Sequence, residues 1–325
     1  MRADPAALPA DLYRAADVGE LDRIAIEEFG IPGATLMDRA GRAAFAALKK
    51  HFPDAGSVCV VCGAGNNAGD GFVVARCAAE AGMPVRVLVL TDAARLKGDA
   101  LGAFEAMRAK GVDAEPFAPE AIEACDVVVD GIFGTGLDRE VTGAFAEAIA
   151  AIGAAGRPVL ALDIPSGLAA DTGRALGACV RAAITISFIG LKRGMFTGDA
   201  RRCCPRVLFD DLQVPAELYA RVAPAARRTS FAELGRVLGP RRRSAHKGRY
   251  GHVLVVGGEA GFSGAARLAG EGAARIGAWR RSASRAPSSC ATASRIARRC
   301  SSSRGAPPCS PSAPDSGAAS GVVPC

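Results

Sequence analysis

The stretch from Gly63 to Gly71 reads Gly-Ala-Gly-Asn-Asn-Ala-Gly-Asp-Gly and separates two apolar segments. Residues 58–62 before it are all valine or cysteine, and residues 72–79 after it are mostly apolar with a helical period. This order predicts a buried strand, a tight loop and a helix. Glycines let the backbone approach a ligand, and a helix start offers free N–H groups to an anion. The sequence therefore predicts a phosphate-bearing ligand just after the first strand.

This loop does not match the dinucleotide-binding fingerprint, in which the glycines are spaced G-x-G-x-x-G. Gly63, Gly65 and Gly69 are spaced G-x-G-x-x-x-G, and Asp70 adds a carboxylate where the fingerprint has small or apolar residues. The two asparagines between the glycines make the motif more specific than a glycine-rich loop alone. The alternative interpretation is a tight turn whose Asp70 side chain faces solvent.

Strand and helix patterns alternate along the rest of the chain. Helices are expected at 17–30, 35–50, 97–110 and 143–152, and strands at 84–90, 112–117, 126–130, 158–163, 182–188 and 206–209. Asp17 with Glu20 forms an N-cap signature for the first helix. Because the strands are apolar throughout, the pattern predicts an α/β fold: a three-layer, doubly wound, mostly parallel Rossmann-like sheet.

Polar residues follow the expected strands at their carboxyl ends, where doubly wound sheets bind ligands. Asp130 and Asp163 are each expected to be the last residue of a strand, and Ser166 follows in the third loop. A carboxylate that ends an apolar strand is costly unless it is paired or bound to a cation. Together with an asparagine of the glycine-rich loop, these oxygens suit a hard cation, a sugar hydroxyl or acid–base chemistry. The alternative is that both aspartates only cap the following turns.

Composition and charge exclude several classes of function. Half of the 325 residues are hydrophobic, which is enough for a large core, and the net charge is +7. Residues 279–325 contain seven arginines and one acid, so the rest of the chain carries only +1 and gives no reason to expect nucleic acid binding. Cys59 and Cys62 are interpreted as core residues, and the three histidines form no transition-metal cluster.

No apolar run approaches the roughly 18 residues of a membrane-spanning helix. Residues 1–10 contain an acid and two prolines rather than the apolar segment of a signal peptide. We therefore expect a cytoplasmic protein that does not bind membranes and whose cysteines are reduced.

Three loops carry a resemblance to a known family. They are 63–71, 130–136 (Asp-Gly-Ile-Phe-Gly-Thr-Gly) and 162–167 (Leu-Asp-Ile-Pro-Ser-Gly). With the two entry helices and residues 188–194, they resemble the NAD(P)H-hydrate epimerase family over roughly residues 11–220. That family forms the N-terminal half of bifunctional nicotinamide nucleotide repair enzymes. It interconverts the R and S forms of hydrated NADH and NADPH (NADHX and NADPHX), which carry a hydroxyl on C6 of the nicotinamide ring.

The resemblance implies site residues by position. Substrate contacts are implied for Asn66, Asn67, Ala68, Gly69, Asp70, Gly134, Thr135, Gly136, Leu137, Asp138, Arg139, Glu140 and Asp163. A bound potassium ion (K+) is implied as cofactor, with oxygens from Asn67, Asp130 and Ser166. A homodimer is in keeping with the family.

The chemistry at C6 needs a proton-transfer group. The carbon next to the ring nitrogen is a carbinolamine, which inverts by losing and regaining water through an iminium or by ring opening and closure. Either route requires a side chain that gives and takes a proton. Asp163 is the predicted catalytic residue, and Asp163→Ala is expected to abolish epimerisation and leave the fold intact. Lys192 is a further candidate for substrate contact, with a solvated surface lysine as the alternative.

The C-terminal part of the chain suggests a second, incomplete domain. Residues 244–278 resemble the opening of an ADP- or ATP-dependent NAD(P)H-hydrate dehydratase, which has a ribokinase-like fold. The predicted organisation is an epimerase domain at 1–220, a linker at 221–243, the start of a dehydratase domain at 244–278 and a disordered or frameshifted tail at 279–325. The pair of domains would make a bifunctional repair enzyme.

The tail has an unusual composition. Residues 279–325 contain twelve serines, seven arginines and four cysteines, and no leucine, phenylalanine or lysine. Such a segment cannot bury a core, so dehydratase activity is expected to be lost. We hypothesise a reading-frame change near codon 278. A genuine disordered tail and a redox-sensitive arginine-rich tail are the alternatives.

Two rival functions are compatible with parts of the sequence. In an NAD(P)-dependent oxidoreductase, Asp92 after the second strand would contact a ribose. The glycine spacing and the absence of an evident hydride-acceptor domain argue against it. The other rival is a non-catalytic binding module, which an epimerisation assay distinguishes from an enzyme.

Overall fold

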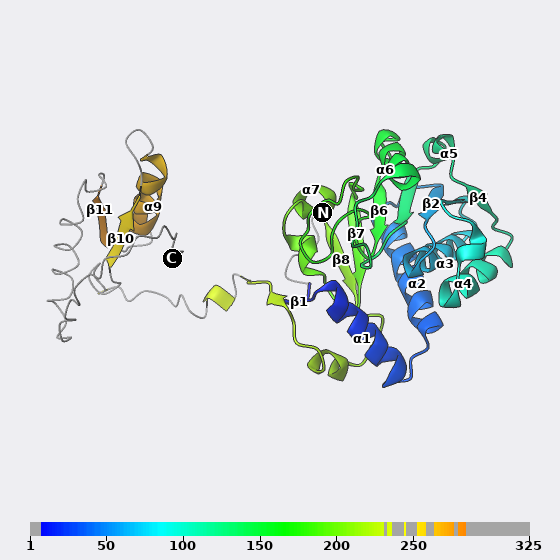
Figure 1. Cartoon of the computed structure of the whole chain (residues 1–325), viewed down its shortest axis with the longest axis horizontal. Coiled ribbons are helices and arrows are strands. Elements are labelled where there is room, and N and C mark those ends of the chain that lie inside the picture. Colours follow the sequence, from blue (N-terminus) through cyan, green and yellow to red (C-terminus); the bar gives the residue numbers. More distant parts are fainter. Residues whose placement is uncertain are drawn as a thin grey trace, which may run out of the picture. The chain divides into compact units, whose positions relative to one another are not determined.

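The computed structural model describes residues 8–230, 233–235, 244, 252–257, 263–275 and 279–283. The chain divides into two compact units, Met1–Val237 and Leu238–Cys325. Elements β1 to β9 belong to the first unit, and β10, α9 and β11 belong to the second (Figure 1).

The first unit alternates strands and helices much as the sequence predicts. Its elements are β1 (Asp11–Leu12), α1 (Ala15–Glu27), α2 (Gly33–His51), β2 (Val58–Cys62), α3 (Asn66–Glu80), β3 (Val85–Val89), η2 (Ala93–Arg95), α4 (Gly98–Arg108), β4 (Ala114–Pro116), α5 (Pro119–Glu123), β5 (Val127–Gly131), α6 (Gly143–Ala154), β6 (Val159–Leu162), β7 (Ile184–Phe188), η3 (Arg193–Phe196), α7 (Ala200–Cys203), β8 (Val207–Asp210), η4 (Ala216–Ala220) and β9 (Ala226–Arg227). The sequence analysis missed the two shortest α-helices, α5 and α7, which are too short to show a periodic pattern.

A seven-stranded sheet forms the centre of this unit, with strand order β4-β3-β2-β5-β6-β7-β8. Every neighbouring pair is parallel, which confirms the predicted doubly wound fold. The chain builds outward from β2 to β4 and then returns to place β5 on the other side of β2. The direction of winding therefore changes between β2 and β5, and the carboxyl ends of strands at such a point form a ligand-binding crevice.

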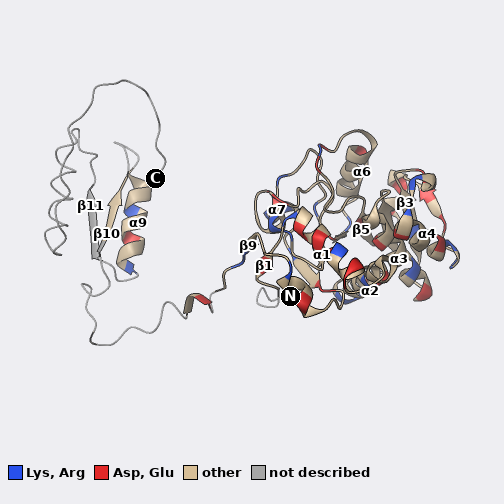
Figure 2. Cartoon of the chain, turned by 60° about the horizontal axis from the view of Figure 1, so that its bottom comes forward, with Lys and Arg blue, Asp and Glu red and all other residues tan. Residues whose placement is uncertain are grey.

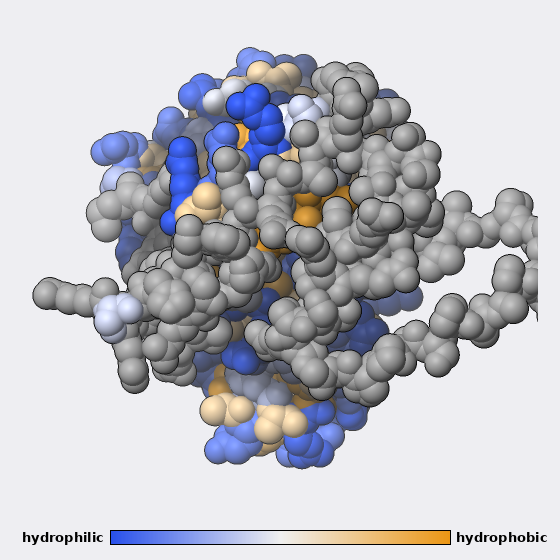
Figure 3. Space-filling view, turned by 90° about the vertical axis from the view of Figure 1, so that its left-hand side faces the viewer, coloured by the Kyte–Doolittle hydropathy of each residue, from blue (hydrophilic) through white to orange (hydrophobic). Residues whose placement is uncertain are grey.

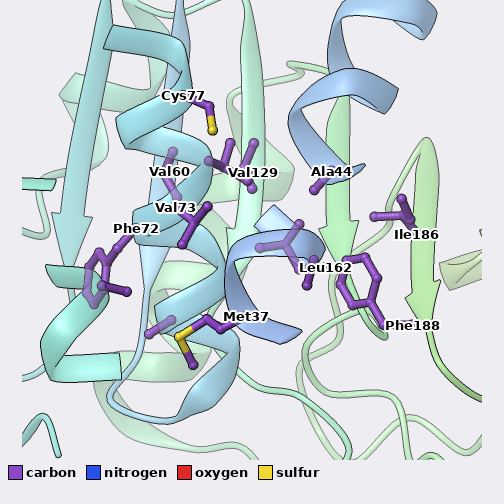
Figure 4. Close-up of a cluster of buried hydrophobic side chains, with 14 of the residues drawn as sticks. Met37, Ala44, Val60, Phe72, Val73, Cys77, Val129, Leu162, Ile186 and Phe188 are labelled. Atoms are coloured by element: carbon purple, nitrogen blue, oxygen red, sulfur yellow. The ribbon is translucent and has the colours of Figure 1, made fainter. Parts of the chain in front are cut away.

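Both faces of the sheet are covered. On β2, Val58, Val60 and Cys62 pack with residues of α1 to α4, whereas Cys59 and Val61 pack with residues of α5 and α6. Figure 4 shows the first of these two clusters, in which side chains of α2 and α3 lie against strands β2, β5, β6 and β7. Burial on both faces explains why the strands lack polar alternation.

The glycine-rich stretch is shorter as a loop than predicted. Helix α3 begins at Asn66, so only Gly63 to Gly65 form the turn. A Cβ on Gly69 would lie 2.5 Å from the sulfur of Met37, and one on Gly71 would lie 2.9 Å from the sulfur of Cys62. These two glycines therefore serve close packing of the helix rather than a longer loop.

Helix α1 also begins earlier than the sequence analysis expected. Arg14 is its N-cap residue, and Asp17 is the third residue inside the helix rather than the cap. The Asp17 carboxylate accepts a hydrogen bond from the Arg14 backbone N–H at 3.0 Å. The acid thus stabilises the helix start from inside the first turn.

The N-terminal strand ties the end of the first unit to its beginning. Strand β1 pairs with β9 in antiparallel register, Asp11 opposite Arg227, and the Arg227 guanidinium donates to the Asp11 carboxylate at 2.9 Å. The first unit consequently extends to Val237, beyond the domain boundary expected at residue 220.

The described part of the second unit is a strand–helix–strand arrangement. Strand β10 (His252–Val256) pairs in parallel with β11 (Trp279–Ala283), and α9 (Gly264–Arg275) lies between them in sequence. Strand β11 occupies the first residues of the segment expected to be a disordered tail. Outside the described residues lie the remainder of that tail, residues 231–232 and 236–243 of the expected linker, and residues 245–251, 258–262 and 276–278 of the expected dehydratase segment.

Charged residues of both signs occur along α1 and around α4 (Figure 2). In the described part of the face seen in Figure 3, hydrophobic areas are small and lie among hydrophilic ones. None of the helices in the described ranges combines the length and hydrophobicity needed to cross a bilayer.

Helix α2 lies so close to α3 at Gly41 that a larger residue there is expected to lower the stability of the protein. A Cβ at Gly41 would lie 2.3 Å from Cβ of Val73 and 2.9 Å from the carbonyl oxygen of Asp70. We expect Gly41→Ala to lower the free energy of unfolding by about 1–3 kcal/mol, because overpacking forces the helices apart. Gly102→Ala in α4, where a Cβ meets nothing within 4 Å, should raise it by about 0.5–1 kcal/mol. Urea denaturation of both variants measures these changes, and equal effects would contradict the packing at Gly41.

Candidate functional site

A pocket of about 720 Å³ lies at the carboxyl ends of the strands where the winding direction changes. Its walls come from α1, the start of α2, and the loops that follow β2, β3, β5, β6 and β7. Of the predicted substrate-contacting residues, those that line it are Asn66, Asn67, Asp70, Gly134, Thr135, Gly136, Leu137, Asp138, Arg139 and Asp163. The three loops singled out in the sequence therefore meet at one cavity.

Three predicted contact residues do not line this pocket. Ala68 and Gly69 are buried inside α3, and their backbone N–H groups are bonded to the carbonyl of Gly65 at 3.0 and 3.3 Å. Glu140 is exposed and lies beside Gly177 instead. The first two misplacements follow from the early start of α3, which turns those residues into the helix interior.

Asp130 is fully buried beneath the pocket and is held by a set of hydrogen bonds. Its Oδ2 accepts from the Ser166 N–H at 2.8 Å, and its Oδ1 accepts from the Ser166 hydroxyl at 2.5 Å and from the Ile132 N–H at 3.2 Å. Burial raises the pKa of Asp130 to about 6, although these hydrogen bonds oppose the shift. Asp130 therefore does more than cap a turn, since it joins the second and third loops.

Asn67 joins the first loop to the same cluster. Its side-chain N–H donates to the Phe133 carbonyl at 2.9 Å, and the Phe133 N–H donates to the Ser166 hydroxyl at 2.9 Å. The structure thus brings together Asn67, Asp130 and Ser166, the residues implied to hold a cation. The Asn67 Oδ1 is buried and has no hydrogen-bond partner in the described part of the chain. A buried carbonyl oxygen without a donor is the kind of atom that a hard cation stabilises.

Asp163 lies just past the end of β6 in an unusual backbone conformation. Its φ is +62°, in the left-handed region, and the Ile164 N–H bonds across it to the Leu162 carbonyl at 2.7 Å. Its own N–H donates to the Ile186 carbonyl at 2.7 Å, which extends the pairing of β6 with β7. The tight three-residue turn therefore fixes the direction of the Asp163 side chain at the pocket wall.

Lys192 is fully buried, so the interpretation of it as a surface lysine is wrong. Its ammonium forms an ion pair with the Asp163 carboxylate and donates to the Ser187 hydroxyl at 3.0 Å and the Phe188 carbonyl at 3.3 Å. The expectation that Asp163→Ala leaves the fold intact is revised accordingly, because that variant would leave a buried ammonium without its charged partner.

The Lys192 backbone is held from the opposite end of the sequence. Tyr13, which follows β1, donates its N–H to the Leu191 carbonyl at 2.8 Å and accepts from the Arg193 N–H at 2.9 Å. These two bonds flank Lys192 and form a parallel bridge between it and Tyr13. The N-terminal segment thus positions the lysine that pairs with Asp163.

Two further carboxylates lie near this ion pair. Asp22 of α1 and Asp70 of α3 both line the pocket and interact electrostatically with Asp163 and Lys192. Burial raises the pKa of Asp22 to about 6, with Lys192 opposing and Asp163 adding to the shift. Burial, followed by the charges of Asp163 and Asp22, raises the pKa of Asp70 well above its ordinary value.

Asp22 was not among the predicted site residues, although the sequence of α1 contains a signal for it. It lies one helical turn after Val18 and next to Leu21, at the edge of the apolar stripe of α1. An acid in that position is adjacent to buried neighbours rather than on the solvated side of the helix. Other missed lining residues include Thr91, Arg95, Phe133, Phe188, Ile189 and Leu212. Asp92, the residue on which the oxidoreductase alternative depends, caps η2 by accepting from the Ala94 N–H at 2.9 Å.

Comparison with solved structures supports the fold. The crystal structure of the yeast protein ynu0 has a TM-score of 0.56 at 19% sequence identity, covering 67% of this chain and 97% of that one. At this identity the likeness shows a shared fold.

Sequence comparison shows the family. The family described as YjeF-related protein N-terminus matches residues 33–194. The NAD(P)H-hydrate epimerase of Limosilactobacillus fermentum is 36% identical over 199 residues, covering 61% of this chain and 94% of that protein. The chain belongs to the NAD(P)H-hydrate epimerase family, as its loops suggested.

Longer relatives are also similar. The bifunctional NAD(P)H-hydrate repair enzyme Nnr of Coxiella burnetii is 42% identical over 267 residues, covering 82% of this chain and 54% of that protein. The Escherichia coli enzyme of the same name is 37% identical over 278 residues, covering 86% and 54%. The chain thus spans about half the length of the bifunctional relatives it matches.

The burial of Lys192 predicts a large effect of removing its charge. We expect Lys192→Met to lower the free energy of unfolding by about 3 kcal/mol, because the Asp163 carboxylate loses its partner in a partly buried site. Lys50→Met on the exposed side of α2 is the matched control and should change it by less than about 0.5 kcal/mol. Chemical denaturation monitored by circular dichroism compares the two. Equal stability of both variants would show that the ion pair is not formed in solution.

Proposed function

We propose that the first unit catalyses the epimerisation of hydrated NADH or NADPH. The observation that carries this proposal is the Asp163–Lys192 ion pair at the wall of a pocket of about 720 Å³, in a chain of the epimerase family. A cavity of that size is in the range of small-molecule and cofactor sites. The names of the similar proteins support the choice of substrate.

The strand ends suggest how a dinucleotide lies in the pocket. The first two N–H groups of α3, at Asn66 and Asn67, have no acceptor within the helix, and such groups bind anions. These two N–H groups are placed to bind the pyrophosphate of the hydrated dinucleotide. Strand β6 is two positions from β2 in the sheet, about 10 Å away, so Asp163 lies where a nicotinamide ring attached to that pyrophosphate can reach.

Asp163 is proposed to move the proton on the C6 hydroxyl. Loss of that hydroxyl as water needs a proton donor, and addition of water to the iminium needs a proton acceptor. The fixed turn at residues 162–164 keeps the carboxylate in one orientation, and its ion pair with the ammonium of Lys192 holds it in place. Both features reduce the reorganisation that the reaction requires.

The hydrogen-bonded cluster of Asn67, which lines the pocket, with the buried Asp130 and Ser166 fits a potassium ion. Asn67, with its unpartnered Oδ1, and the oxygens of Asp130 and Ser166 are proposed to hold it. A bound K+ would supply positive charge next to a substrate that carries a negatively charged pyrophosphate. All of these donors are oxygens, the ligand type that hard cations prefer.

We also propose that the protein is located in the cytoplasm and forms a homodimer. The oxidoreductase alternative has lost its main support because Asp92 is engaged in the cap of η2.

The proposed activity is tested by incubating the full chain with one purified epimer of NADPHX and following the other by chromatography. The wild-type protein should reach the equilibrium mixture faster than the buffer control. Asp163→Asn, which keeps the size of the side chain, should lower kcat/KM by about 100-fold or more. Asp113→Asn, an exposed acid at 82% side-chain exposure, is the control and should behave as wild type. No conversion above the buffer rate by wild type would refute the function and favour a binding module.

The cation site is tested without an activity measurement. Raising KCl, at constant ionic strength made up with choline chloride, should raise the thermal unfolding midpoint of the wild type, because a ligand that binds the folded state stabilises it. Asn67→Ala should abolish the shift. A midpoint that is the same in both salts would show that these residues hold no potassium.

A further inference from the structure

We propose that Asp22 of helix α1 is a second proton-transfer residue, serving the face of the nicotinamide ring opposite to the one that Asp163 serves. This inference rests on the proposed epimerase function and extends it. In the iminium route, inversion at C6 requires that water leave from one face of the ring and add to the other. A single fixed carboxylate reaches only one face, so the reaction is better served by two groups on different walls.

The two aspartates come from different walls of the pocket. Asp163 directly follows β6 of the central sheet, whereas Asp22 belongs to α1, whose Val18, Gly19 and Ile26 also line the pocket. A ring held between the helix and the strand end would present one face to each. The Asp22 carboxylate makes no hydrogen bond or salt bridge within the described part of the chain, so no structural role occupies it.

The surrounding charges favour Asp22 over Asp70 for this role. Asp22, Asp70 and Asp163 share one ammonium, that of Lys192, so the three acids cannot all ionise without a cost. Burial, followed by the charges of both neighbouring acids, raises the pKa of Asp70 well above its ordinary value. Asp22, with a pKa raised to about 6, can both lose and regain a proton near neutral pH.

The step is balanced in atoms and charge. In one direction, the Asp22 carboxyl donates its proton to the C6 hydroxyl, the C–O bond breaks, and water leaves as the ring nitrogen and C6 form an iminium. A water molecule then adds to C6 from the other face, and its proton goes to the ionised Asp163 carboxylate. In the reverse direction the two residues exchange roles. Before a second turnover in the same direction, the proton on Asp163 returns to Asp22 through water, so the protein is regenerated and no oxidant or reductant is consumed.

This scheme separates the two half-reactions, which oxygen exchange can measure. In H₂¹⁸O, water that leaves and returns on the same face labels the starting epimer without inverting it. Asp22→Asn should lose label exchange for one epimer by about 100-fold or more and keep it for the other. Asp163→Asn should show the reverse pattern, and neither variant should epimerise at the wild-type rate. Mass spectrometry of the separated epimers gives the rate of oxygen exchange for each of the two epimers in each of the two variants.

Controls keep the test decisive. Glu20→Gln removes an exposed acid of the same helix, paired with Arg23 at 2.7 Å, and should exchange both epimers like wild type. Asp22→Glu restores a carboxylate and should recover part of the lost exchange. Such a recovery would not be expected if Asp22 had only a structural role. If Asp22→Asn epimerises at the wild-type rate, or if both Asn variants lose exchange for the same epimer, the inference is wrong. Absence of epimerisation by the wild type would instead overturn the proposed function itself.

Discussion

The burial of one ammonium group organises the ligand-facing end of the sheet. Lys192 has no exposed surface, and removing an ammonium from water costs several kcal/mol unless partners replace the lost hydration. Its three partners are the Asp163 carboxylate, the Ser187 hydroxyl and the Phe188 carbonyl, from the ends of β6 and β7. Satisfying this one group therefore fixes two strand ends relative to each other. Tyr13, from the other end of the unit, holds the lysine backbone in place.

Backbone strain is concentrated at the same place. Among the described residues, four non-glycine positions have positive φ, and three of them, Asp163, Ile189 and Leu212, line the pocket. Ile189 is β-branched, which makes its φ of +56° especially unfavourable. The Gly190 N–H bonds across it to Phe188 at 2.6 Å, the same three-residue turn that is found at Asp163. Strain of this kind persists where surrounding contacts determine the conformation, and here the strand pairing and the buried ion pair do so.

Local patterns were enough to predict the sheet and much of the pocket. The bounds of β2 were predicted correctly because an apolar run is followed directly by glycines. Asn67, Asp130 and Ser166 were expected to lie together because the carboxyl ends of parallel strands meet at one edge of the sheet. Ala68 and Gly69 were misplaced because α3 already begins at Asn66, and the close packing of Gly69 against Met37 is a contact with another helix that no local pattern reveals. The position of Lys192 depends on the backbone hydrogen bonds of Tyr13, and the position of Asp22 depends on how α1 packs against the rest of the unit. Both are contacts between segments far apart in sequence.

The charge balance of the pocket follows from these placements and bears on the chemistry. Three carboxylates lie near one ammonium, and burial raises the pKa of both Asp22 and Asp70 above the ordinary value of a carboxyl group. An epimerisation consumes no proton overall. Each proton given to the leaving hydroxyl group is recovered from the water molecule that adds to C6. Such a reaction needs a proton held in place and passed between neighbouring groups rather than a supply from solvent. A pocket in which several carboxylates lie near one ammonium suits the proposed epimerisation, because a proton given up by one acid has another carboxylate nearby to receive it.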